Sequence, residues 1–162
     1  MEKSKLIKIA LTMICAIAFF SARAQHTANL KSFDGVWAGV LKDKNDKESL
    51  VVVKILNGLA SRYDYNDDTK KFEKSSFIKE NSMVLGNNLS FTWMNKGGIW
   101  SENQTYMISY LKPGVLYCRL IRQVNNVSED KNSPGMNDEW STYFEGALTH
   151  YDTIAALEKA LL

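Results

Sequence analysis

Apolar and polar residues alternate with a period of two along most of the chain between residues 35 and 149. This alternation is typical of half-buried β-strands, and Gly, Asn, Asp and Pro interrupt it at short intervals. The pattern predicts eight or nine strands, at residues 35–41, 50–56, 59–65, 71–79 (weaker), 83–85, 89–94, 100–111, 115–124 and 140–149.

Two dipeptides indicate how neighbouring strands connect. Asn57-Gly58 lies between two apolar runs, where both residues can take the positive φ that a tight hairpin turn requires. Pro113-Gly114 is typical of a type II turn, because Pro presets φ at the first central position and Gly supplies positive φ at the second. Strands joined by such short turns pair as antiparallel neighbours.

These elements predict an all-β fold, an antiparallel up-and-down meander. An eight-stranded barrel accommodates the strands most simply, because it leaves no exposed sheet edge, and a sandwich or a strongly curved open sheet is the alternative. After the last strand, the sequence predicts a short helix at 152–162, with Asp152 as its N-cap. One domain over residues 25–162 is expected.

Residues 1–24 have the pattern of a cleaved secretory signal. Three lysines precede an apolar run at 9–20, and Ser21-Ala22-Arg23-Ala24 places small residues where a signal peptidase reads. The run is shorter than the roughly 20 residues that a membrane span needs. We therefore expect export to a periplasm or the cell exterior, with no membrane span after cleavage; the alternative is an uncleaved anchor or a buried helix.

Cleavage changes the charge of the chain. The full sequence has a formal net charge of +2, but residues 25–162 hold 16 basic and 17 acidic side chains. Hydrophobic residues make up 45% and charged residues 23%, which is the balance of a globular protein. Because no cluster of basic residues is evident, a nucleic-acid partner is not expected.

Few residues indicate catalysis or metal binding. The chain has no Gly-x-Ser-x-Gly, phosphate-binding glycine loop or His-Glu-x-x-His motif. Cys118 lies among leucines and is expected to be a buried, inert thiol. The acidic stretch at 64–68 is similar to a calcium loop but lacks its Gly and its bidentate Glu, so a hairpin turn is expected. We predict a protein that is not an enzyme and has no metal or cofactor.

Aromatic and polar residues in the later strands are the candidates for a binding site. Large aromatic side chains with a polar group suit a pocket or a surface patch. The predicted binding residues of this kind are Trp93, Trp100, Tyr106 and Trp140. Glu102 and Gln104 share a face with Trp100 and Tyr106, so an inward orientation would make a polar cavity. Glu is rarely buried unpaired, which favours an outward, solvated face, and the aromatic residues would then form an outer patch.

Phe33-Asp34-Gly35-Val36-Trp37 places a Gly-x-Trp at the start of the first strand. This resembles the opening of the lipocalin and calycin families, in which the Trp plugs one end of the barrel. The resemblance implies that Arg119 or Arg122, on a late strand, packs on Trp37, a cation–π contact. The length and tight hairpins look more like the avidin or barrel-shaped inhibitor branch.

Two functions follow, and the sequence leaves both open. The first is an exported binding protein for a small apolar or amphipathic ligand, with a mouth gated by the polar loop at 125–138. The second is a solid barrel that binds a protein partner, as an inhibitor or immunity protein does, through that loop and exposed aromatic residues. The direction in which Trp100, Glu102, Gln104 and Tyr106 point distinguishes them.

Overall fold

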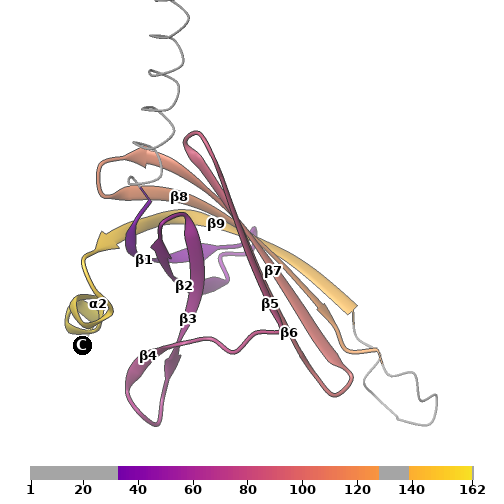
Figure 1. The fold of residues 1–162 in the computed structure, drawn as a ribbon. Coiled ribbons are helices and arrows are strands. Elements are labelled where there is room, and N and C mark those ends of the chain that lie inside the picture. Colours follow the sequence, from indigo (N-terminus) through magenta and orange to yellow (C-terminus); the bar gives the residue numbers. More distant parts are fainter. Residues whose placement is uncertain (1–32, 128–138, 162) are drawn as a thin grey trace, which may run out of the picture.

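A computed structural model describes residues 33–127 and 139–161, which form a curled β-sheet and one short helix (Figure 1). The predicted signal at 1–24 and most of the loop at 125–138 lie outside the described residues. The elements are β1 (Gly35–Lys42), β2 (Glu48–Leu56), β3 (Leu59–Asn66), β4 (Lys71–Lys74), β5 (Lys79–Leu85), β6 (Asn88–Gly97), β7 (Trp100–Lys112), β8 (Val115–Asn125), β9 (Glu139–Tyr151) and α2 (Ile154–Leu161).

The strands form one antiparallel sheet in the order β4-β3-β2-β1-β9-β8-β7-β6-β5. Consecutive strands pair with each other except β4 and β5, and β1 pairs with β9, so the predicted antiparallel up-and-down topology is confirmed. The predicted turns are present, since Asn57, Gly58 and Gly114 all have positive φ. The sheet is a half-barrel of nine strands, where eight closed strands were expected.

The sheet opens between β4 and β5, which are its two edges. The predicted strand at 71–79 is interrupted, because residues 75–78 are not strand and separate β4 from β5. Side chains connect β3 to β5 across this seam: the Ala60 amide donates to Ser82 Oγ (2.8 Å), and Ser61 Oγ donates to Glu80 Oε2 (3.3 Å). The seam is therefore held by side chains.

Cross-strand register arranges the inward side chains of β5–β9 in rows across the sheet. The first row is apolar and comprises Val84, Leu89, Ile108 and Cys118; the second contains Ser82, Phe91, Tyr106, Leu120 and Phe144. Apart from Val84 and Ser82 on the edge strand β5, these side chains are at most 2% exposed. Inward residues of β1–β3 complete the same cluster, so side chains fill this part of the half-barrel.

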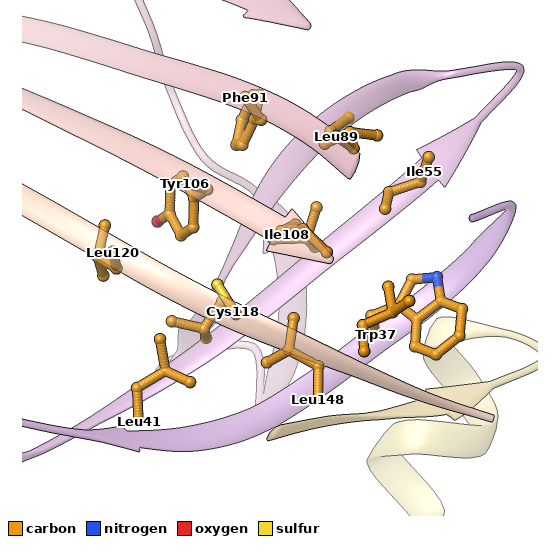
Figure 2. Close-up of a cluster of buried hydrophobic side chains, with 14 of the residues drawn as sticks. Trp37, Leu41, Ile55, Leu89, Phe91, Tyr106, Ile108, Cys118, Leu120 and Leu148 are labelled. Carbon is orange, nitrogen blue, oxygen red and sulfur yellow. The ribbon is translucent and has the colours of Figure 1, made fainter. Parts of the chain in front are cut away.

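Trp37 lies at one end of this cluster, and Phe91, Tyr106 and Leu120 lie toward the other (Figure 2). The Trp37 side chain is 2% exposed, and its Nε1 donates to the carbonyl of Phe33 at 2.7 Å. The ring beside Trp37 is that of His150, at 4.9 Å between centroids in an edge-on arrangement. The Trp37 end is therefore apolar and densely packed.

Helix α2 covers part of the outer face of the sheet. Leu157 is fully buried in a second cluster with residues of β1, β2 and β4. The N-cap is Thr153 rather than the predicted Asp152, because Thr153 Oγ1 accepts from the Ala156 amide at 3.0 Å. Glu158 accepts from the Phe72 amide (2.8 Å) and ties β4 to the helix. Within the described ranges, no helix is long and apolar enough to cross a membrane.

Close approach of β1 and β9 requires glycine at position 39. A Cβ there would lie 2.1 Å from the carbonyl oxygen of Ala147, which is backbone and cannot move aside. We expect Gly39→Ala to lower the free energy of unfolding by about 3 kcal/mol, measured by urea denaturation. Gly97→Ala is the control, because its nearest neighbour would be a Trp100 atom at 3.9 Å. Equal stability of the two variants would contradict this account of the β1–β9 contact.

Candidate functional site

The third inward row of β5–β9 is polar, unlike the first two. Register places Glu80, Trp93, Gln104, Arg122 and Thr142 opposite one another across the five strands. Trp93 is 3% exposed and Gln104 is 4% exposed. The interior therefore changes from apolar to polar toward the end of the half-barrel that is opposite Trp37, and we call this end the polar mouth.

A chain of hydrogen bonds runs from the second row through the third to Glu102, which lies on the same face of β7 beyond the third row. Tyr106 donates its hydroxyl to Gln104 Oε1, and Gln104 Nε2 donates to Glu102 Oε1 at 2.5 Å. Arg122 donates to both carboxylate oxygens of Glu102, from Nε at 2.5 Å and from a terminal nitrogen at 3.1 Å. This two-point pairing fixes the planes of both groups and offsets the desolvation cost of burying Glu102.

Opposing influences act on the pKa values of this chain. Burial raises the pKa of Glu102, but hydrogen bonds from Arg122 and Gln104 and the charges of Arg122 and Arg62 outweigh it, so the net pKa lies below its ordinary value of 4.5. Burial raises the pKa of Tyr106 well above 10. At neutral pH, Glu102 is therefore an anion and Tyr106 remains a neutral donor.

A second arginine reaches the polar mouth from the other side of the seam. The Arg62 guanidinium of β3 stacks over the ring of Trp93 on β6, 4.4 Å from its centroid. Arg62 also pairs with Asp64 (2.5 Å), whose other oxygen accepts from Ser75 Oγ at 2.6 Å. The Arg62–Trp93 contact joins β3 to β6 where no strand ladder connects them, and the pair with Asp64 holds Arg62 in place.

Glu80 and Trp93 each carry a buried polar atom without a hydrogen-bond partner among the residues that the structure describes. Glu80 Oε2 pairs with Lys74 Nζ at 3.0 Å, but Oε1 has no donor. Trp93 Nε1 likewise has no acceptor. The two residues are directly opposite on β5 and β6, so an unused acceptor and an unused donor belong to neighbouring side chains.

A hollow of about 530 Å³ borders the polar mouth. Its lining includes Glu102, Val124 and Trp140 from the inner face, and outer-face residues such as Asn103 and Gln123, so it wraps around the ends of the strands. Trp140 is 36% exposed, and the Arg122 guanidinium lies 5.0 Å from the centroid of its ring. The hollow therefore offers apolar area directly beside the Glu102–Arg122 pair.

The structure corrects two expectations about these residues. Glu102 and Gln104, for which the outward orientation was favoured, are buried on the inner face, because Arg122 and Tyr106 supply their partners. Neither arginine takes the position expected on Trp37. Arg122 stacks over Trp140, and Arg119 lies on the outer face, beside Tyr117 and Glu145.

The remaining candidates do not all meet in one place. Trp93 and Tyr106 are buried in the interior, whereas Trp140 lies at the rim of the mouth. Trp100 is half-buried at the tip of the β6–β7 hairpin, where it pairs with Gly97. Of these four aromatic residues, Trp93, Tyr106 and Trp140 have a polar partner or an unused polar atom in the mouth.

Sequence reasoning missed Glu80 and Arg62. Glu80 falls between the predicted strands at 71–79 and 83–85, so its inward orientation was not visible. Arg62 lies two residues after buried Ala60 in β3 and therefore shares its face of the strand, which is a signal that could have placed Arg62 inside. Its contact with Trp93 crosses the seam, and no hairpin turn predicts that contact.

The other candidate features have structural explanations. The acidic stretch at 64–68 is a hairpin turn in which Asn66 Oδ1 accepts from the amides of Asp68 and Thr69. Cys118 is fully buried, and burial raises the pKa of its thiol to about 12. Within the described part of the chain, no group of three His, Cys, Asp or Glu residues could hold a metal ion.

Comparisons of the chain with protein-family models, with curated proteins and with solved structures give no match. Any proposal about function therefore depends on the geometry of the polar mouth.

The lowered pKa of Glu102 makes a prediction about pH dependence. A carboxylate whose folded-state pKa is depressed stabilises the fold above its ordinary pKa, and this stabilisation is lost as pH falls through the lowered value. We expect Glu102→Gln to lose about 2 kcal/mol of unfolding free energy at neutral pH, measured by urea denaturation. The difference from wild type should shrink below about pH 4.

Glu145→Gln is the matched control, because Glu145 is an exposed carboxylate on the outer face that also pairs with an arginine. Its loss at neutral pH should be smaller than that of Glu102→Gln. A deficit of Glu102→Gln that is equal at pH 7 and pH 3 would show that the ionised Glu102–Arg122 pair does not stabilise the fold.

Proposed function

We propose that the protein is an exported, lipocalin-like binding protein for a small amphipathic molecule, and that the polar mouth is its binding site. The observation that carries this proposal is the polar third row inside an otherwise apolar half-barrel. Buried polar groups cost free energy unless they are satisfied, and here a buried donor and acceptor lack partners. A ligand that supplies both partners would offset that cost.

The packing of the interior determines how such a ligand would enter. Side chains fill the first two rows, so the apolar part of a ligand has no room at the Trp37 end. The ligand would place its polar head on the third row and its apolar part against Trp140 and Val124 at the rim. The hollow of about 530 Å³ is within the range that small-molecule sites occupy.

The pattern of residues 1–24 supports the exported location in this proposal, since it is typical of a cleaved secretory signal. After cleavage, the near-neutral domain would meet its ligand in a periplasm or outside the cell. The absence of catalytic motifs from the sequence favours binding over catalysis.

A protein-interaction module is the second candidate, and the filled interior is the observation that favours it. Tyr143, Met107 and Arg119 are exposed on the outer face of β7–β9, where a protein partner could bind. The loop at 125–138, the other surface expected for a partner, lies mostly outside the described residues. This candidate leaves the unused polar atoms of Glu80 and Trp93 without a role.

Native mass spectrometry of the protein recovered from its own exporting host tests the proposal. We expect wild type to carry a discrete small mass that disappears on denaturation. Trp140→Ala should carry much less of it, because the ligand loses the ring that Arg122 also contacts. Tyr143→Ala, which removes an outer-face aromatic side chain, is the matched control and should keep the mass.

A protein-sized complex in place of the small mass would favour the interaction module. A bare wild-type chain that also fails to bind short amphipathic molecules saturably would contradict the proposed function.

A further inference from the structure

We infer that the ligand carries a neutral polar head, an alcohol hydroxyl or a carboxamide, which accepts a hydrogen bond from Trp93 Nε1 and donates one to Glu80 Oε1. This inference rests on the proposed function and names the chemical class of the ligand. It follows from which hydrogen-bonding groups of the polar mouth are already used and which are not.

The cations of the polar mouth are already paired. Arg122 holds Glu102, and Lys74 holds Glu80. Arg62 holds Asp64. An anionic head would have to compete with a carboxylate that is already in place, and a cationic head would meet the guanidinium or ammonium of the same pair. The charges of the mouth therefore favour neither sign on a ligand.

Among the described residues of the inner face, the buried side-chain atoms without a partner are one donor and one acceptor; a third such atom, Asn103 Oδ1, belongs to the outer face. Trp93 Nε1 can only donate, and Glu80 Oε1, a carboxylate oxygen of the group that pairs with Lys74, is an acceptor. Both atoms are buried, and their residues are directly opposite on β5 and β6. A hydroxyl or a primary amide satisfies both atoms, whereas a carboxylate cannot donate to Glu80 and an ammonium cannot accept from Trp93.

Access to this pair requires side-chain movement and no opening of the sheet. Arg62 lies over the Trp93 ring and its side chain is 22% exposed, while the Lys74 side chain is 44% exposed. Both are long side chains, whose rotamers exchange quickly when they are partly exposed. Movement of these two side chains is therefore the proposed way in which the head of the ligand reaches the pair.

Four probes with the same tail test the inference: 1-octanol, octanamide, octanoate and octylamine at pH 7. Binding is followed by the indole N–H signal of Trp93 in a ¹H–¹⁵N spectrum, which the Trp93→Phe variant assigns. We expect octanol and octanamide to shift this signal and to bind about tenfold more tightly than the two ions, the effect of one satisfied hydrogen bond.

Two variants test the donor and the carboxylate charge separately. Trp93→Phe removes the donor and should weaken octanol about tenfold. Glu80→Gln removes the charge with little change of shape, so the preference for octanol over octanoate should fall toward one. Tyr143→Phe and Glu145→Gln, on the outer face, are the matched controls and should behave as wild type. If Trp93→Phe does not fold, Glu80→Gln tests the inference alone.

The outcomes distinguish this inference from the proposed function. Saturable binding in which octanoate or octylamine equals or exceeds octanol would overturn the neutral head and leave a binding mouth. Binding of octanol that leaves the Trp93 indole signal unmoved would also overturn the inference. Failure of all four probes to bind would overturn the proposed function, and the inference with it.

Discussion

Pairing between β1 and β9 is the constraint on which the rest of the structure depends. It joins the four N-terminal strands to the five C-terminal strands in one sheet, and without it neither part would have an interior. Gly39 permits this contact, because the carbonyl of Ala147 occupies the space that a side chain would need. The curl of the joined sheet brings β3 across from β5, where side chains hold the seam.

The curled sheet gives its interior a direction. Rows of apolar side chains run from the Trp37 end to Phe91 and Tyr106, and the next row is polar. The carboxylate of Glu102, just beyond that row, is tolerated because Arg122 and Gln104 both donate to it. The filled apolar end and the incompletely satisfied polar end are the observations on which the proposed binding site rests.

Period-two alternation was sufficient to predict nearly all of the strands and their antiparallel order, because short turns leave few other arrangements. It could not predict which residues face one another in β7 and β8. A bulge between Tyr110 and Lys112 shifts the register by one residue, so counting back from the Pro113-Gly114 turn places the wrong residue opposite Gln104. The Arg122–Glu102 pair was therefore not foreseeable.

The seam between β4 and β5 could not be predicted from the sequence for a related reason. The alternation in 71–79 is weak, so the break between β4 and β5 was not predicted, and Glu80 was assigned to no strand. Its neighbour Trp93 was predicted as a binding residue, but Glu80, which supplies the unused acceptor opposite Trp93, was not. A high-resolution crystal structure of the protein recovered from its natural host tests the account most directly. The account predicts non-protein density within hydrogen-bond distance of both Trp93 Nε1 and Glu80 Oε1, continuing toward Trp140. Direct bonds from these two atoms to each other or to other protein groups, with no such density, would contradict it.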